Sequence, residues 1–298
     1  MKIIDAHMHY SNIASFRECG LLTSEVDYSA QGYLAEAGAC GIVRSICMGL
    51  SERPPSEFPD IGAETPMQAD LSDELPPEIL LCLGINPHTL TPGAIEQMDK
   101  IIHDNIDNAN VRRVSRIDKD ARNVRIVGIK IYAGYYHYDV NDPIYAPAFD
   151  FAQRHNLPVA IHSGDTYSEK GKLIYAQALS IDNLAVDRPD MRIIICHMGA
   201  PWIFDGCEVA GKNANVYMDL SGLLVGNAAF FNSMLQKPLI LDRYRQAIQM
   251  LDNYDKLLFG TDWPLAPMAS YIKFCKELVP PETYDKVFYG NAARVYSL

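Results

Sequence analysis

Short runs of apolar residues recur along the whole chain, and most of them are separated by longer segments with helical spacing. The runs are nearly continuous in Ile, Val and Leu, which is typical of parallel strands buried on both faces. The pattern therefore predicts eight strands, beginning with the run at Ile3 and Ile4 and continuing at 41–48, 79–85, 124–132, 157–162, 191–197, 216–220 and 256–262.

The segments between these runs favour helices, because apolar positions recur there at the spacing of one helix face. Helices are expected at 28–37 (with Gly38 as C-cap), 94–106, 146–155, 172–186, 239–251 and 281–295. Strands that alternate with helices predict an α/β fold, and eight such units predict a (β/α)8 TIM barrel. The chain has 298 residues, so we expect one domain over residues 1–298, distorted by one long loop.

That long loop is the segment 51–78, which follows the second predicted strand. It is acidic and contains six prolines, at 54, 55, 59, 66, 76 and 77. Proline pairs near both of its ends argue against a helix there. We expect an excursion on the active face of the barrel, and the sequence leaves open whether it caps the site or is a surface loop.

The amino-acid composition limits the classes of binding partner and the cellular compartment that we expect for this protein. The net charge is -11 and the pI about 5.1, which disfavours nucleic acids and anionic membranes as partners. No apolar stretch is long enough for a membrane helix, and Asp5 and His7 interrupt any secretory leader. The seven cysteines form no CxxC pair, so reduced thiols and a cytoplasmic location are expected.

Histidines and one aspartate stand at the ends of the predicted strands. His7 and His9 are two residues apart at the end of the first strand, so their side chains share one face. His162 ends the fifth strand, His197 the sixth and Asp262 the eighth. The carboxyl ends of barrel strands form the active face, so these residues are expected to converge there. Imidazoles with a carboxylate suit a divalent transition metal, and a catalytic site keeps one position open for water.

With these residues the chain resembles the amidohydrolase superfamily. It is most similar to the amidohydrolase-related (amidohydrolase 2) branch of metal-dependent TIM-barrel hydrolases and decarboxylases. The motifs that carry the resemblance are Ile-Asp-Ala-His-Met-His, Ala-Ile-His-Ser-Gly, Cys-His-Met-Gly-Ala-Pro-Trp, Phe-Gly-Thr-Asp-Trp-Pro and the closing Tyr-Gly-Asn-Ala-Ala-Arg. The resemblance implies one metal per chain, with Zn²⁺ the expected ion, held by His7, His9, His162 and Asp262. It also implies that Asp262 acts as general base. His197 would orient or polarise water or substrate, or bind a second metal.

Lys130, at the end of the fourth predicted strand, has several interpretations. In some superfamily members a lysine at this place is carboxylated and bridges two metals, whereas the branch that this chain most resembles holds one metal. We therefore expect a free amine that binds a substrate carboxylate or pairs with an acid at the barrel rim. Lys130, Tyr132 and Trp202 are the candidate substrate contacts.

These residues predict an enzyme that acts on a small molecule. The expected reaction is hydrolysis of an amide, ester or lactone by metal-activated water. Non-oxidative decarboxylation of an unsaturated or aromatic acid is the alternative, because it would use the same ligands. A non-catalytic metal-binding barrel is a third hypothesis. The sequence does not identify the substrate, and it does not decide whether the protein forms a homo-oligomer.

Overall fold

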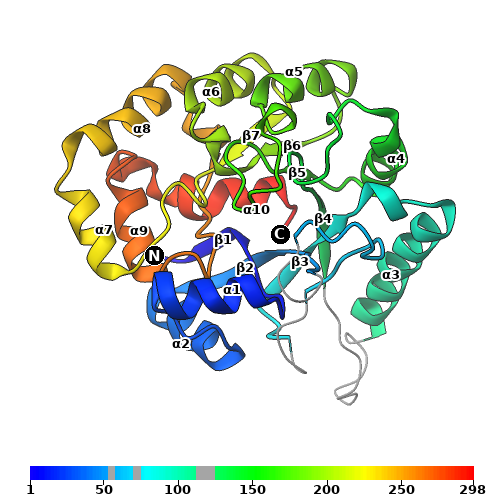
Figure 1. Ribbon diagram of the computed structural model, residues 1–298, viewed down its shortest axis with the longest axis horizontal. Helices are drawn as coiled ribbons and strands as arrows, with labels where there is room; N and C mark the ends of the chain where they lie inside the picture. Colours follow the sequence, from blue (N-terminus) through cyan, green and yellow to red (C-terminus); the bar gives the residue numbers. More distant parts are fainter. Residues whose placement is uncertain (53–57, 70–74, 112–124) are drawn as a thin grey trace.

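The computed structural model describes residues 1–52, 58–69, 75–111 and 125–298, and it contains one eight-stranded parallel sheet. The strands pair in chain order from the first to the eighth, as Figure 1 shows. Their bounds are β1 Ile3–Met8, β2 Ile42–Met48, β3 Ile79–Ile85, β4 Ile126–Ile131, β5 Val159–Ile161, β6 Ile193–Ile195, β7 Val216–Asp219 and β8 Leu257–Leu258.

The sheet curls into a nearly closed barrel because β1 meets the segment that follows the short β8. The Ala6 amide donates to the Phe259 carbonyl, and the Asp262 amide donates to the His7 carbonyl, each at 2.8 Å. The His9 amide continues the seam by donating to Trp263 at 2.8 Å. The predicted TIM barrel is confirmed, and its seam places Asp262 directly beside His7.

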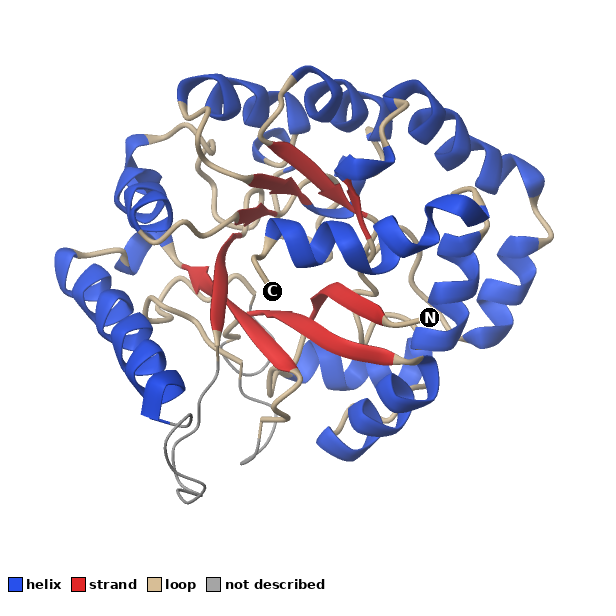
Figure 2. Ribbon diagram, turned by 180° about the vertical axis from the view of Figure 1, so that it is seen from behind, coloured by secondary structure: helices blue, strands red, loops and turns tan. Residues whose placement is uncertain are grey.

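Helices surround the barrel in both views (Figures 1 and 2). Their bounds are α1 Ala14–Cys19, α2 Ala30–Cys40, α3 Pro92–Val111, α4 Ala146–Arg154, α5 Ala178–Asp187, α6 Ile203–Lys212, α7 Ala228–Leu235, α8 Pro238–Leu251, α9 Met268–Lys276 and α10 Asn291–Val295. No helix in the described part of the chain is both long and apolar enough to cross a membrane.

Several predicted helix bounds were wrong. Helix α2 starts after Ser29, whose side chain accepts from the Gly32 amide, and it runs past Gly38 to Gly41. Gly41 has φ 74°, a left-handed conformation that glycine adopts at low cost, so it is the C-cap in place of Gly38. The segment 172–186 contains a 3₁₀ turn, Leu173–Tyr175, before α5. The segment 281–295 is divided into a 3₁₀ turn, a π-helical turn and α10.

Helices α1, α6, α7 and α9 were not predicted. Of these, α6 contains Gly206 and Gly211, which lower its helix propensity. Gly206 is nevertheless required by packing. A Cβ at this position would lie 2.4 Å from the Met198 carbonyl oxygen, so a glycine lets α6 approach the turn that carries His197.

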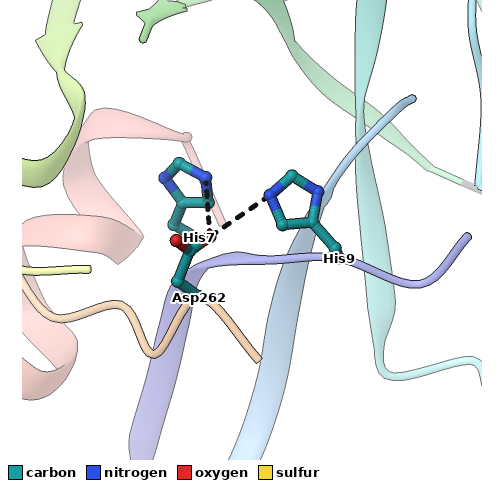
Figure 3. A group of neighbouring side chains, drawn as sticks. All are labelled: His7, His9 and Asp262. Atoms are coloured by element: carbon teal, nitrogen blue, oxygen red, sulfur yellow. Dashed lines mark ion pairs between the residues drawn. The ribbon is translucent and has the colours of Figure 1, made fainter. Parts of the chain in front are cut away.

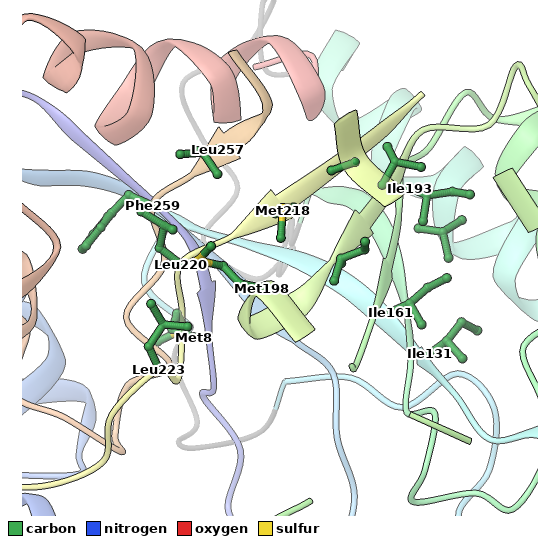
Figure 4. Packing of buried hydrophobic residues seen from close by; sticks show 14 of the residues in the cluster. Met8, Ile131, Ile161, Ile193, Met198, Met218, Leu220, Leu223, Leu257 and Phe259 are labelled. Carbon is green, nitrogen blue, oxygen red and sulfur yellow. The ribbon is translucent and has the colours of Figure 1, made fainter. Parts of the chain in front are cut away.

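Two large layers of the apolar core are separated by the sheet, and a third, smaller cluster includes Phe16 and Tyr132. The outer layer lies between strands and helices and includes the residues labelled in Figure 4, such as Ile131, Ile161 and Ile193. The inner layer fills the barrel with residues such as Ile4, Leu80 and Ile194, and Tyr296 and α10 pack against it. Figure 2 shows α10 crossing one end of the barrel, so that end is covered and the opposite end is left for the site.

An irregularity in β1 directs the first two histidines. Asp5 pairs with Ser45 and Met8 with Cys47, so β1 has one residue more than β2 over this stretch. Ala6 belongs to the inner layer and Met8 to the outer layer, although alternation alone would put both on one face. Bulges of this kind commonly turn side chains beside active sites. Here the bulge turns His7 and His9 toward the barrel mouth.

The predicted excursion 51–78 falls partly outside the described residues, which omit 53–57 and 70–74. Its described part contacts the end of β3, since Met67 bridges to Gly84 and the Asn86 side chain donates to the Ala63 carbonyl at 2.7 Å. Phe58, also in this part, lies against Tyr135 with ring centroids 4.6 Å apart. The excursion thus contributes at least one aromatic side chain to the active face.

Candidate active site

His7, His9 and Asp262 form a buried group at the open end of the barrel (Figure 3). Asp262 Oδ1 lies 3.5 Å from His7 Nε2 and 3.2 Å from His9 Nε2. Ligands about 2.1 Å from a tetrahedral zinc ion stand roughly 3.4 Å from one another. The two distances to Asp262, with the ligand atoms of the group all within 4.8 Å of one another, therefore suit a single transition-metal ion.

The same atoms also have the chemistry that a metal requires. His7 Nε2 and Asp262 Oδ1 are fully buried and lack a hydrogen-bond partner among the described residues. Leaving such polar atoms unsatisfied costs free energy, unless a ligand supplies the missing interaction. Burial, followed by the charge of Lys130, lowers the pKa of His7 to about 3, so its imidazole is neutral at physiological pH. The donor set fits a divalent transition metal.

Asp262 keeps its negative charge. Burial alone would raise its pKa, but His197, His9 and His7 more than offset this and hold the pKa below its usual range. The backbone of Asp262 has φ 58°, a left-handed conformation that is uncommon for a residue with a side chain. Asp262 was predicted at the end of a strand. It lies instead in the loop beyond β8, which ends at Leu258.

His197 stands beside this group in an unusual turn rather than at the end of β6. His197, Met198 and Gly199 all have positive φ, at 58°, 52° and 70°. Consecutive left-handed residues are costly and occur where surrounding contacts impose them, often at functional sites. The His197 Nδ1 lies 3.1 Å from the Ser221 carbonyl oxygen. Burial lowers the pKa of His197, which favours the neutral imidazole. Since only an N–H can donate to a carbonyl, Nδ1 carries the proton and Nε2 is the unprotonated ring nitrogen.

Gly222 holds the Asp262 and His197 side chains against the β7 loop. A Cβ at Gly222 would lie 2.6 Å from both Asp262 Oδ2 and His197 Nδ1, and its φ of 60° is left-handed. Any side chain here would displace the two groups. The position therefore requires glycine for space as well as for conformation.

His162 reaches the same mouth but is differently engaged. Its ring centroid lies 5.0 Å from that of His197 and 4.8 Å from that of Tyr135. Its Nε2 contacts the Asp165 carbonyl oxygen at 2.9 Å, and it is not in the group formed by His7, His9 and Asp262. The structure brings His162 into the site without directing Nε2 at the other candidate ligands.

Lys130 is buried inside the barrel, with 1% of its surface exposed. Its Nζ donates to Cys196 Sγ at 2.9 Å and lies 5.4 Å from the centre of the Tyr132 ring. No carboxylate of the described residues lies within ion-pair distance of it. The predicted partner acid at the barrel rim is therefore not found in the described part of the chain.

A cavity of about 740 Å³ opens above these residues. Its lining includes all the predicted site residues except Trp202, which stands partly exposed at the start of α6 between the lining residues Pro201 and Ile203. Aromatic side chains form much of the wall: Phe16, Phe58, Tyr132, Tyr135, Tyr167 and Tyr244. Such a cavity suits a small, partly apolar molecule.

Sequence reasoning missed two buried aspartates. Asp219 at the end of β7 accepts from His7 Nδ1 at 2.8 Å, and Asp5 accepts from the Thr261 amide at 2.9 Å. Burial raises the pKa of Asp5 to about 7 despite these hydrogen bonds. Asp219 is the next-to-last residue of the predicted strand 216–220, and proximity to a strand end is the signal that selected the histidines and could have selected it too.

A second group of potential ligands, His7, Cys196 and Asp219, is less suited to a metal. The Lys130 ammonium donates to Cys196, and a cation bound there would meet this positive charge at close range. His7 Nδ1 is also already occupied by Asp219.

Comparisons with known proteins give a family for the chain and agree with its TIM-barrel fold. A family model described as Amidohydrolase matches residues 103–298, about two thirds of the chain. A comparison with curated proteins gives no match.

Solved structures resemble the chain over its whole length. An uncharacterised TIM-barrel protein from Bordetella bronchiseptica has 20% identity and a TM-score of 0.65, with 100% of this chain and 99% of that chain covered. An amidohydrolase from Burkholderia multivorans has 15% identity and a TM-score of 0.62, with both chains covered completely. A 5-carboxyvanillate decarboxylase from Novosphingobium aromaticivorans, complexed with manganese and 4-hydroxy-3-methoxy-5-nitrobenzoic acid, has 12% identity and a TM-score of 0.57, with 100% and 96% covered. At these identities the likeness shows the fold.

Proposed function

The chain belongs to the Amidohydrolase family of enzymes, and from this premise we propose that it is a metal-dependent hydrolase of a small-molecule amide, ester or lactone. The family match confirms the resemblance seen in the sequence and covers His162, His197 and Asp262. The observation that carries the proposal is the buried group of His7, His9 and Asp262, in which the unsatisfied His7 Nε2 and Asp262 Oδ1 face each other.

We propose one divalent metal per chain, with Zn²⁺ as the expected ion. His7, His9 and Asp262 would hold it, and His162 would be the fourth protein ligand after its ring approaches the other three. Its Nδ1 would supply the lone pair, because Nε2–H donates to the Asp165 carbonyl. When bound, the metal would activate a water molecule and polarise the scissile carbonyl.

The chain's own residues then supply orientation and proton transfer. Asp262 is ionised and can accept the proton of the attacking water at Oδ2, the oxygen that faces His197. His197 presents an unprotonated Nε2, so it can accept a hydrogen bond from water or take up a proton and return it to the leaving group. The aromatic walls would position the substrate and exclude bulk water.

Decarboxylation of an aromatic or unsaturated acid is the second candidate function. The buried Lys130 ammonium and the aromatic cavity wall favour it, because an anionic, planar substrate would satisfy both. The decarboxylase from Novosphingobium aromaticivorans binds manganese and a nitrobenzoic acid, which makes this chemistry a reasonable alternative on the same fold.

One experiment separates these functions. Metal-loaded enzyme is incubated with libraries of amides, esters, lactones and carboxylic acids in ¹⁸O-labelled water, and products are analysed by mass spectrometry. Hydrolysis adds one labelled oxygen to the product, whereas decarboxylation releases carbon dioxide without such labelling. The proposal predicts the first result, and a chelated sample and His7→Ala should both be inactive. Carbon dioxide release would establish the second function, and stoichiometric metal without turnover on any library would favour the non-catalytic barrel.

We also propose a cytoplasmic location, because all seven cysteines are free thiols in the structure. Free buried thiols are typical of proteins from reducing compartments.

A further inference from the structure

Asp219 contacts two parts of the site at once. One oxygen, Oδ2, lies 2.8 Å from His7 Nδ1. The other, Oδ1, accepts from the His197 amide at 2.8 Å and from the Ser221 amide at 3.1 Å. Only 1% of the surface of Asp219 is exposed, so water does not compete for these contacts. A single carboxylate thus joins a candidate metal ligand to the backbone of a candidate proton-transfer residue.

The contact with His7 determines which ring nitrogen is available. Asp219 Oδ1 accepts from the His197 amide, the Ser221 amide and the Ser221 hydroxyl, so the carboxyl group acts as an acceptor in each of these contacts. With Oδ2 as an acceptor too, His7 Nδ1 carries the proton. Nε2 then keeps its lone pair, and Nε2 is the atom that faces Asp262.

The contact with His197 supports an unfavourable backbone. His197 has φ 58°, and its amide is anchored by Asp219 Oδ1. The Ser221 hydroxyl extends this anchor, because it lies 2.5 Å from Asp219 Oδ1 and 2.9 Å from His197 Nδ1. The hydroxyl donates to the carboxylate and accepts from Nδ1–H, which again leaves His197 Nε2 unprotonated.

We propose that Asp219 is a positioning residue that sets the tautomer of His7 for metal binding and holds His197 in its left-handed turn. The inference rests on the proposed function, because it assigns His7 to a metal and His197 to proton transfer. Outer carboxylates of this kind raise the basicity of a ligating histidine, and their loss typically costs about 10- to 100-fold in metal affinity. Such a carboxylate usually acts on one ligating histidine, whereas Asp219 contacts both His7 and His197.

The substitution Asp219→Asn tests both contacts. An amide has one acceptor and one donor end, so it cannot accept from His7 and from the His197 amide together. If its NH₂ faces His7, the imidazole must shift its proton to Nε2 and lose the free lone pair. If its NH₂ faces the His197 amide, two donors oppose each other and the turn loses its anchor.

The first readout is metal affinity, measured with Zn²⁺ by competition against a chromophoric chelator. Asp219→Asn should bind zinc about 10- to 100-fold more weakly than the unmodified protein. Tyr217→Phe is the matched control, since Tyr217 lies on β7 but its hydroxyl contacts Arg294 away from the site. This control should leave zinc affinity unchanged.

The second readout needs no metal. Nitrogen-15 NMR of histidine-labelled, metal-free protein reports the protonated ring nitrogen, and His7→Gln identifies the His7 signals. The unmodified protein should show His7 protonated at Nδ1, and Asp219→Asn should change the pattern of the His7 signals or those of His197. Circular dichroism confirms that the variant is folded. Should Asp219→Asn not fold, Ser221→Ala replaces it and should alter the His197 signals alone.

The outcomes separate the two proposals. Absence of zinc binding in the unmodified protein would contradict the proposed function. Normal zinc binding by both the unmodified protein and folded Asp219→Asn, with unchanged histidine signals, would overturn the role of Asp219 alone. Lower thermal stability with unchanged affinity would show that Asp219 only supports the fold.

Discussion

The two sides of the barrel mouth differ in how far their candidate metal-ligand atoms are preorganised. On the side of β1 and β8, the buried and unsatisfied His7 Nε2 and Asp262 Oδ1 face each other, and His9 Nε2 also faces Asp262 Oδ1. On the side of β5, His162 already has its Nε2 on a carbonyl of its own loop at 2.9 Å. Both sides contribute imidazoles to the same cavity, so residue type alone does not distinguish them.

The difference follows from the backbone on each side. The seam between β1 and the segment after β8 fixes Asp262 against His7 through hydrogen bonds that any side chain would keep. The loop after β5 instead places the Asp165 carbonyl within reach of His162. The first side is organised before a ligand arrives, whereas His162 lies outside that group and must approach it before it can bind the same ion. Preorganisation of this kind lowers the cost of binding.

The largest expected effect comes from replacing His7 and His162 separately by Ala. Loss of His7 removes an organised ligand atom, so the protein should lose its stoichiometric zinc. Loss of His162 removes a ligand that must first approach the other three, so zinc affinity should fall less. Elemental analysis after dialysis measures the first effect and chelator competition the second. His103→Ala, on the exposed surface of α3, is the control. Equal losses in both variants would show that the two sides are equivalent.

A somewhat smaller effect on metal, but a large one on turnover, is expected for Asp262→Asn. The backbone bond to His7 remains, so the fold should be kept, while the negative charge and the candidate base are lost. Turnover should fall by about 100-fold or more, as for the loss of a general base. Asp165→Asn, another carboxylate at the cavity, serves as control. Retention of most activity by Asp262→Asn would place the base elsewhere.

The smallest effect on metal is expected for Lys130→Met, which keeps the length of the stem but removes the charge. If Lys130 binds a substrate anion, KM should rise or kcat fall, while zinc content stays the same. The control is Lys256→Met, a buried lysine whose Nζ donates to the carbonyls of Asn213, Ala214 and Val216 outside the cavity. Loss of zinc from Lys130→Met, with two metals per chain in the unmodified protein, would instead support a carboxylated bridge.

The sequence predicted the barrel because the buried strands are coded locally, as apolar runs such as 79–85 and 216–220. The ends of these runs were less certain. Asp262 lies beyond β8 and is held by a bond to His7, a partner from the other end of the chain. His197 lies in a turn with positive φ, which a pattern of apolar residues does not encode.

The sequence predicted residues that line the candidate site, but not their hydrogen-bond partners or the backbone that positions them. The His-x-His pair at His7 and His9 points into the mouth as expected, although a bulge in β1 was needed for it. Asp219 could not be linked to His7, because 212 residues separate them along the chain. The engagement of His162 by its own loop depends on the path of the backbone, and the motif Ala-Ile-His-Ser-Gly does not reveal it.

One metal is expected to bind at the side of the mouth formed by β1 and β8. Anomalous X-ray diffraction at the zinc edge, on crystals grown with stoichiometric zinc, locates that metal directly. We expect one strong anomalous peak per chain, bonded to His7 Nε2, His9 Nε2 and the Asp262 carboxylate. A zinc peak elsewhere in the chain, or no peak in that group while zinc is bound, would contradict it.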